Sequence, residues 1–197
     1  MNKLTLDEAN LNAINSVYQR GELVILPTDT LYGLTAQALK PDAVEQVYKL
    51  KKRSPEKPFI ILISDLKMLD LFGVKPTLKQ NKLLSKVWPG QVSVILPCNI
   101  EKLEYLHRST NSLAFRLPKD KILRDLISQT GPLIAPSANT EGNEPALTIQ
   151  EAYRYFGEDV PLYIDAGVKQ SQPSTLISLL NGNIEVLRGS LDPELLK

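Results

Sequence analysis

The chain has 197 residues, of which 43% are hydrophobic and 23% are charged, a balance typical of an ordered globular protein. Its 23 basic and 22 acidic residues leave a net charge of +1, which excludes a whole-protein field that draws in nucleic acid. The single cysteine excludes a disulfide scaffold. Apolar runs stay well short of the roughly 20 residues that span a bilayer, which excludes a membrane span. Because the N-terminus also has no apolar leader, we predict a cytoplasmic protein.

Helix-like and strand-like segments alternate along most of the chain. Apolar spacing and capping residues predict helices at 7–20, from 41 into the basic residues near 51, and at 76–88, 119–129 and 148–156, the last opened by a capping box from Thr148 to Glu151. Short apolar runs predict strands at 22–26, 59–63, 92–96, 113–117, 133–135, 162–164, 175–180 and 184–187. Asn181-Gly182 between the last two runs predicts a hairpin. We therefore expect one α/β domain over residues 1–197, with a mixed sheet and flanking helices.

Two polar loops directly follow predicted strands. Thr28 and Thr30 flank Asp29, and their hydroxyls could face one pocket from an extended segment, or could bond the local backbone in a plain turn. Ser137 and Asn139 follow the run 133–135, at the strand end where open α/β sheets bind ligands. They could donate to a carboxylate or a phosphate, or could form a turn.

A basic cluster follows the second predicted helix. Five cations fall between positions 49 and 57, at Lys49, Lys51, Lys52, Arg53 and Lys57. The cluster could be the solvated, cationic end of a helix. It could also present Lys51 and Arg53 rigidly to a phosphate, because prolines follow at 55 and 58. The local sequence leaves both interpretations open.

Arg116 stands inside a predicted strand, where a charge needs a partner or a cavity because an unpaired buried charge is costly. His107 is the single histidine, and its polar neighbours favour a place on the surface. A lone surface histidine counts against a histidine-dependent triad and a histidine-rich metal site. The glycine-rich motifs of P-loop and dinucleotide-binding proteins are also missing from the sequence.

Taken together and in order, eight motifs make the chain resemble the YrdC/TsaC-type threonylcarbamoyl-AMP synthases, in their short, single-domain form. The match runs from about residue 10 to residue 190. Its motifs are Pro27-Thr28-Asp29-Thr30-Leu31-Tyr32-Gly33-Leu34, Lys51-x-Arg53, Lys57-Pro58, Trp88-Pro89-Gly90, Leu113-Ala114-Phe115-Arg116, Ala135-Pro136-Ser137-Ala138-Asn139, Pro173-Ser174-Thr175 and Leu187-Arg188-Gly189.

The resemblance implies a twisted, largely open mixed sheet with a concave basic face. It implies a nucleotidyltransferase that converts L-threonine, bicarbonate and ATP into threonylcarbamoyl-AMP and diphosphate. Mg²⁺ would accompany ATP, with no zinc, haem or flavin. The product would feed N6-threonylcarbamoyladenosine modification of tRNA through partner proteins that transfer the group, and the basic face could also bind RNA.

The resemblance also implies roles for individual residues. Lys51 and Arg53 would be catalytic and bind the nucleotide phosphates, with Ser112, Asn139 and Arg188 also on the ATP side. The threonine side would comprise Thr28 or Thr30, Arg116, Ser137 and Ser174, with Arg116 pairing with the carboxylate. Metal ligands are not implied. Ser54 stands where the family usually has proline, which predicts a looser loop after Arg53.

Two other functions fit the same motifs. A non-catalytic module for double-stranded RNA would show steeply salt-dependent binding and no need for threonine, although the near-neutral net charge counts against it. A carbamoyl-adenylate-forming enzyme, as in hydrogenase-maturation carbamoyltransferases, would use carbamoyl phosphate in place of threonine. Those enzymes carry zinc-binding and acylphosphatase parts that we do not find in this sequence.

Overall fold

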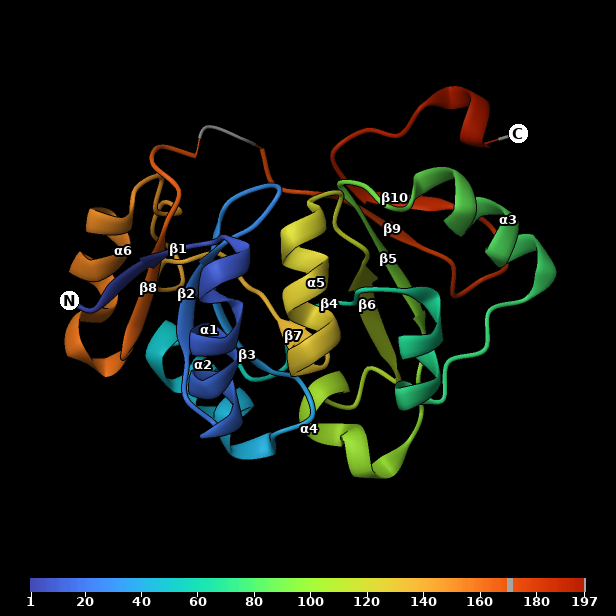
Figure 1. The fold of residues 1–197 in the computed structure, drawn as a ribbon. Helices are drawn as coiled ribbons and strands as arrows, with labels where there is room; N and C mark the ends of the chain where they lie inside the picture. Colours follow the sequence, from blue (N-terminus) through green and yellow to red (C-terminus); the bar gives the residue numbers. More distant parts are fainter. Residues whose placement is uncertain (170–171, 197) are drawn as a thin grey trace.

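Ten strands form one mixed sheet through the residues that this computed structural model describes, 1–169 and 172–196 (Figure 1). The spatial order is β1-β8-β2-β3-β7-β4-β6-β5-β9-β10. The pairs β1/β8, β2/β8, β4/β6 and β5/β9 are parallel, and the other five are antiparallel. The strands are β1 Lys3–Thr5, β2 Val24–Pro27, β3 Tyr32–Gln37, β4 Ile60–Leu62, β5 Val92–Pro97, β6 Ser112–Arg116, β7 Leu133–Ile134, β8 Leu162–Asp165, β9 Thr175–Ser178 and β10 Glu185–Arg188.

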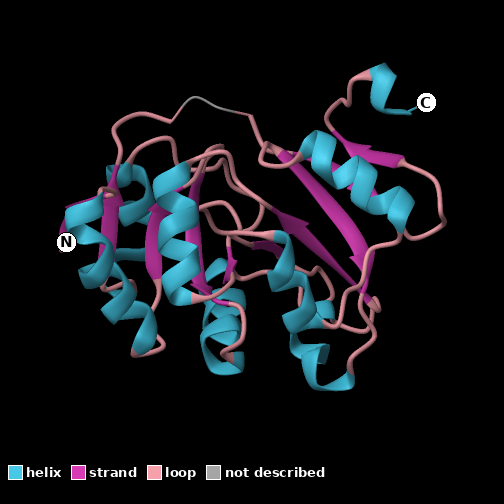
Figure 2. Cartoon of the chain, turned by 45° about the vertical axis from the view of Figure 1, so that its right-hand side comes forward, coloured by secondary structure: helices cyan, strands magenta, loops and turns pink. Residues whose placement is uncertain are grey.

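Helices surround this sheet (Figure 2). They are α1 Leu11–Gln19, α2 Pro41–Lys51, α3 Leu78–Val87, α4 Glu104–His107, α5 Lys121–Thr130 and α6 Ile149–Phe156, with short 3-10 segments at Glu8–Asn10, Leu66–Phe72, Glu101–Leu103, Gly157–Asp159 and Pro193–Leu196. The predicted capping box of α6 is present, since Thr148 and Glu151 bond each other's backbone N–H. Within the described ranges, none of the helices is both long enough and apolar enough to cross a bilayer.

Side chains alternate along the strands and divide the core into two clusters. In β2, Val24 and Leu26 pack with α1 and α5, whereas Ile25 between them packs with α2 and α6. The residues of β8 alternate in the same way. Because successive side chains of a strand point to opposite faces, helices cover both faces of the sheet at β2 and β8.

The predicted fold class is confirmed, and every predicted helix and strand has a counterpart near its predicted position. The antiparallel β9–β10 hairpin is also present. Among the described strands and α-helices, β1, β3 and α4 were not predicted. Strand β3 lies between β2 and β7 and is buried along its whole length, so it shows no alternation of polar and apolar residues. Gly33, a residue type typical of turns, and the polar Thr35 further weaken the signal of a strand in this segment.

The prediction that His107 lies on the surface is wrong. Its exposed fraction is 4%, and its Nε2 lies 3.3 Å from the carbonyl oxygen of Ile100. It ends α4, a single helical turn in which Leu106 is also buried. The side chain of His107 therefore points inward although its neighbours in sequence are polar, and those neighbours could not predict its burial.

Candidate functional site

Strand ends and loops surround a cavity of about 480 Å³. Strand β6 contributes the alternate residues Ser112, Ala114 and Arg116 to its lining, whereas Leu113 and Phe115 between them belong to the core. The loop after β2, the loop after β7 and the start of β4 add further walls, and the hairpin β9–β10 adds another. The polar loops predicted from the sequence therefore lie at one place.

The turn between β2 and β3 contributes two hydroxyls. Thr28 and Thr30 both line the cavity, and their Oγ1 atoms lie 2.9 Å apart. Thr28 Oγ1 also donates to the carbonyl oxygen of Leu31 at 2.8 Å, which closes the turn. Both interpretations of this segment thus apply, since the same threonines form a local turn and face the cavity.

Arg116 is almost completely buried at the base of this turn. Its Nη1 donates to Thr30 Oγ1 at 3.0 Å, and its Nη2 lies 3.2 Å from Asp29 Oδ1 in an ion pair. Burial lowers the pKa of Arg116, while the charge of Asp29 raises it. The Nε atom of Arg116 is buried without a hydrogen-bond partner among the described residues. Arg116 therefore has both a charged partner, Asp29, and a cavity beside it, and its Nε–H makes no hydrogen bond to the described residues.

Two further arginines reach the same cavity. Arg53 Nε donates to the carbonyl oxygen of Lys57 at 3.1 Å, and Arg188 donates through Nε and Nη2 to the carbonyl oxygen of Ser174 at 3.1 and 3.0 Å. Burial and, after it, the charge of Arg53 lower the pKa of Arg188. Glu56 is the one acidic side chain in the described lining. The cavity is therefore electropositive.

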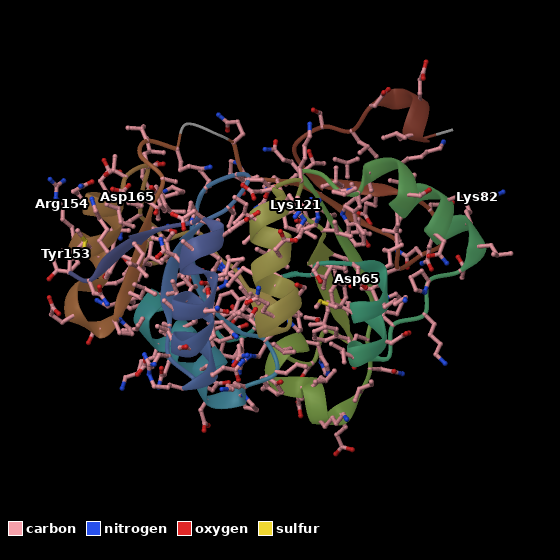
Figure 3. The ribbon with its side chains drawn as sticks, in the orientation of Figure 1. Asp65, Lys82, Lys121, Tyr153, Arg154 and Asp165 are labelled. Atoms are coloured by element: carbon pink, nitrogen blue, oxygen red, sulfur yellow. The ribbon has the colours of Figure 1, made fainter. Side chains whose placement is uncertain are left out.

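That charge comes from the lining of the cavity and not from the protein surface as a whole. Lys82 on α3 and Arg154 on α6 point outward, away from the sheet (Figure 3). Because the net charge of the chain is only +1, the three arginines of the cavity concentrate positive charge in one place.

Lys51 lies behind the cavity and does not line it. Its exposed fraction is 2%, and Nζ donates to the carbonyl oxygens of Ser137 and Asn139 at 2.5 and 2.6 Å and to Asn139 Oδ1 at 3.2 Å. Burial, then the charge of Arg53, lowers the pKa of Lys51 to about 7. Three oxygen acceptors match the three N–H groups of an ammonium ion, and a neutral amine has only two. This geometry therefore favours the charged form of Lys51 and opposes the effect of burial.

Asn139 is likewise engaged within its own loop. Its Nδ2 donates to the carbonyl oxygens of Asn143 and Thr140 at 2.5 and 3.2 Å, and its Oδ1 accepts from Ser137 Oγ at 2.6 Å. Asn139 also does not line the cavity. Of the ten predicted site residues, the structure brings eight into the lining, namely Thr28, Thr30, Arg53, Ser112, Arg116, Ser137, Ser174 and Arg188.

Glu141 was not predicted, yet it joins the two loops that carry Arg53 and Ser137. Its carboxylate accepts from Ser54 N at 2.7 Å and pairs with Lys57 Nζ at 2.8 Å. These two contacts hold the pKa of Glu141 down at about 2. We expected Ser54 to give a looser loop after Arg53. Instead, its backbone N–H, which a proline would lack, donates to the Glu141 carboxylate and joins this loop to the loop that carries Ser137.

Apolar side chains complete the lining and were also not predicted. They include Phe59, Ile60, Ile95, Leu176 and Pro145. In sequence, such residues are indistinguishable from core positions of strands, so no local signal could have identified them. They give the cavity an apolar wall beside its cationic groups, as is usual for small-molecule sites.

The model of the Sua5/YciO/YrdC family, described as telomere recombination, matches residues 16–190. The chain belongs to this family. A family relative, the threonylcarbamoyl-AMP synthase of Bacillus subtilis strain 168, is 34% identical over 143 residues, which cover 71% of this chain and 41% of the relative. The threonylcarbamoyl-AMP synthase of Yersinia enterocolitica serotype O:8 is 30% identical over 179 residues, 89% of this chain and 94% of the relative.

Solved structures of the Sua5/YciO/YrdC family show the same fold. The structure of P. abyssi Sua5 complexed with L-threonine matches with a TM-score of 0.86 at 27% identity, covering 95% of this chain and 56% of that one. The chain thus spans about half the length of the Bacillus and P. abyssi relatives, and nearly the whole of the Yersinia relative.

Proposed function

We propose that this chain is a threonylcarbamoyl-AMP synthase, which converts L-threonine, bicarbonate and ATP into threonylcarbamoyl-AMP and diphosphate. One observation carries the proposal. Three arginines, Arg53, Arg116 and Arg188, converge on one cavity whose other polar groups are mainly hydroxyls. Such a site suits two anions better than it suits bond cleavage by a strong base. The name of the Bacillus and Yersinia relatives and the L-threonine bound to P. abyssi Sua5 support the same activity.

Arg116 is the proposed partner of the threonine carboxylate. The guanidinium has five N–H donors, and only two of its nitrogens are engaged, by Thr30 and Asp29. The remaining N–H groups of Nη1 and Nη2 leave donors for a carboxylate oxygen. The hydroxyls of Ser137 and Ser174, which line the same cavity, could hold the remaining polar groups of the amino acid.

Arg53 and Arg188 are the proposed partners of the nucleotide phosphates, with Ser112 beside them. The threonine amine attacks carbon dioxide derived from bicarbonate and loses a proton, which gives a carbamate. One carbamate oxygen then forms a bond to the α-phosphorus, and the bond from that phosphorus to the bridging oxygen breaks, so that diphosphate leaves with the electron pair. Arginines that align both anions and neutralise the developing charge can supply most of this acceleration.

Lys51 and Asn139 keep a proposed role in this scheme, although both lie behind the lining. Through its bonds to the carbonyl oxygens of residues 137 and 139, Lys51 holds the loop that presents Ser137. Its positive charge also adds to the field at the bound phosphates. We therefore place Lys51 among the residues that position the site, together with Asn139.

We propose that Mg²⁺ enters as part of the ATP substrate. Glu56 is the one carboxylate in the described lining, and the described residues contain no group of three or more histidine, cysteine, aspartate or glutamate side chains that could hold a metal ion. This donor set does not fit a metal held by the protein alone. Magnesium commonly binds through substrate phosphates and retained waters.

We further propose that the product serves tRNA modification, with partner proteins that transfer the threonylcarbamoyl group to adenosine. The adenylate is a mixed anhydride of a carbamate and a phosphate, so a following step has to present a nucleophile to it. No feature of the cavity described above provides for an RNA base. A separate transferase therefore fits the chemistry best.

A diphosphate-release assay on the purified chain tests the proposal. We expect release from ATP only when both L-threonine and bicarbonate are present, and loss of that release in Arg53→Ala. Release driven instead by carbamoyl phosphate would establish the carbamoyl-adenylate activity. No release, together with salt-sensitive binding of double-stranded RNA that survives Arg116→Ala, would establish the RNA-binding alternative.

A further inference from the structure

Arg53 stands at one end of a row of four side chains. Its guanidinium carbon lies 5.2 Å from the centre of the Phe59 ring. The Phe59 ring lies 4.1 Å from the ring of Tyr48, with 33° between the two planes. Tyr48 in turn faces Arg108, whose guanidinium carbon lies 4.0 Å from the centre of the tyrosine ring. We call Arg53, Phe59, Tyr48 and Arg108 the cation–aromatic stack.

The stack joins segments that are distant in sequence. Tyr48 lies on α2, Phe59 precedes β4 and Arg108 directly follows α4. Arg108 is fixed from its other side by an ion pair to Glu45 at 2.5 Å. Tyr48 and Phe59 are 6% and 3% exposed, so the two rings between the arginines are screened from water. Attraction between a cation and a ring is stronger in such a desolvated place.

One carbonyl oxygen completes the arrangement. Lys57 O accepts from Tyr48 Oη at 3.0 Å and from Arg53 Nε at 3.1 Å. The Phe59 ring covers one face of the Arg53 guanidinium, and the hydrogen bond to Lys57 O occupies its Nε edge. Its terminal Nη atoms make no hydrogen bond within the described residues, although Arg53 lines the cavity. The binding end of the side chain is therefore left for a ligand, and its other end is held.

We propose that Phe59, Tyr48 and Arg108 are positioning residues that hold the Arg53 guanidinium ready for an anion. The identity of that anion, a nucleotide phosphate, rests on the proposed function. Arg108 and Tyr48 do not line the cavity, so any influence through contacts passes by way of Phe59 and Arg53, whereas a direct field of the Arg108 charge would persist without Arg53. A side chain fixed before binding loses less rotamer freedom when the ligand arrives, which strengthens binding.

A first experiment needs no ligand and uses the Arg53 Nε–H proton in NMR spectra of the purified chain. We expect slow exchange of this proton with water in the unmodified protein, and at least about five-fold faster exchange in Phe59→Leu and Arg108→Gln. Phe72→Leu is the matched control, because Phe72 is a fully buried core phenylalanine that contacts Phe115 and not Arg53. Equal exchange rates in Arg108→Gln and the unmodified protein would overturn the proposal.

A second experiment measures ATP binding by titration calorimetry. We expect Arg108→Gln and Phe59→Leu to weaken binding about five-fold, and to have no further effect when Arg53 is already alanine. Arg20→Gln, which makes the same change of charge at a surface ion pair outside the stack and the lining, serves as the control and should stay within about two-fold. A loss of affinity that persists in the Arg53→Ala background would mean that Phe59 or the charge of Arg108 acts on the nucleotide without Arg53, and would overturn the positioning role.

The two experiments separate this inference from the proposed function. If the unmodified chain does not bind ATP, the proposed function fails, while the exchange of the Arg53 proton still decides whether the stack positions the arginine. If the chain binds ATP and Arg108→Gln binds it equally well, the proposed function stands and the stack has no role in binding.

Discussion

Lys51 and Ser137 lie 86 positions apart in the sequence, yet Lys51 Nζ donates to the carbonyl oxygen of Ser137 at 2.5 Å. This contact joins the end of α2 to the loop after β7, and a second bond to the carbonyl oxygen of Asn139 reinforces it. Arg53, only two residues along, lines the cavity instead. The two cations of the Lys-x-Arg motif therefore have different surroundings, one buried among carbonyls and the other lining the cavity.

This difference predicts unequal losses of stability when the two cations are replaced. Lys51→Met should lower the free energy of unfolding by about 2 kcal/mol, because two buried carbonyl oxygens lose a charged donor. Arg53→Ala should lower it by less than about 1 kcal/mol, since it removes one cation–ring contact and one hydrogen bond at a partly exposed site. Urea denaturation of both variants checks the prediction, and equal losses of stability would contradict it. Both variants should lose diphosphate release.

The sequence could show that cations gather after α2, but not which of them turns inward. Lys52 ends the helix in the left-handed conformation, with φ of 51°, and reverses the chain direction between Lys51 and Arg53. Glycine usually occupies such a position, so a lysine there gave no signal of the reversal. Glu141 could not be predicted for a different reason, because its partner Ser54 is 87 positions away and neither residue belongs to a periodic pattern.

Where prediction succeeded, it relied on local physical rules. Arg116 in a strand required a partner or a cavity, and the structure has both. The loops around Thr30 and Ser137 were predicted at strand ends, and both line the cavity. The apolar wall at Phe59 escaped prediction because burial in a core and exposure to a ligand cavity require the same residue types.

Arg116→Lys should raise the KM for L-threonine at least about ten-fold and leave the KM for ATP nearly unchanged. A lysine keeps the charge, but its single nitrogen lacks the planar fork by which Arg116 contacts Thr30 and Asp29 through two separate nitrogens. Steady-state diphosphate release at varied threonine and varied ATP checks this. Arg124→Lys is the matched control, because Arg124 donates to the carbonyl oxygens of Pro118 and Lys119, away from the cavity. A larger change in the KM for ATP than for threonine would reject the assignment of Arg116.

Glu141 should make stability depend on pH in the acid range. Its pKa is about 2 in the folded chain and 4.5 as an ordinary glutamate, so its contribution to stability is complete above pH 4.5. The contribution is lost as pH falls from 4.5 towards 2, because the glutamate of the unfolded chain takes up a proton in this range while the paired carboxylate of the folded chain stays ionised. Glu141→Gln should therefore differ most from the unmodified chain at neutral pH and least near pH 2. Urea denaturation across this range checks the trend, and a constant difference between the two proteins would contradict it.

Diphosphate, the proposed leaving group, should inhibit the enzyme in competition with ATP, because Arg53 and Arg188 line the cavity together. Replacing either arginine by alanine should raise the inhibition constant of diphosphate about ten-fold or more, since each loses charge-assisted hydrogen bonds to phosphate oxygens. Arg20→Ala provides the control, as this surface arginine pairs with Glu22 and lies outside the lining. Inhibition kinetics give this constant for the unmodified chain and the control, and direct calorimetric titration with diphosphate gives the affinity of Arg53→Ala and Arg188→Ala. Unchanged diphosphate affinity in both alanine variants would show that the phosphates lie elsewhere in the cavity.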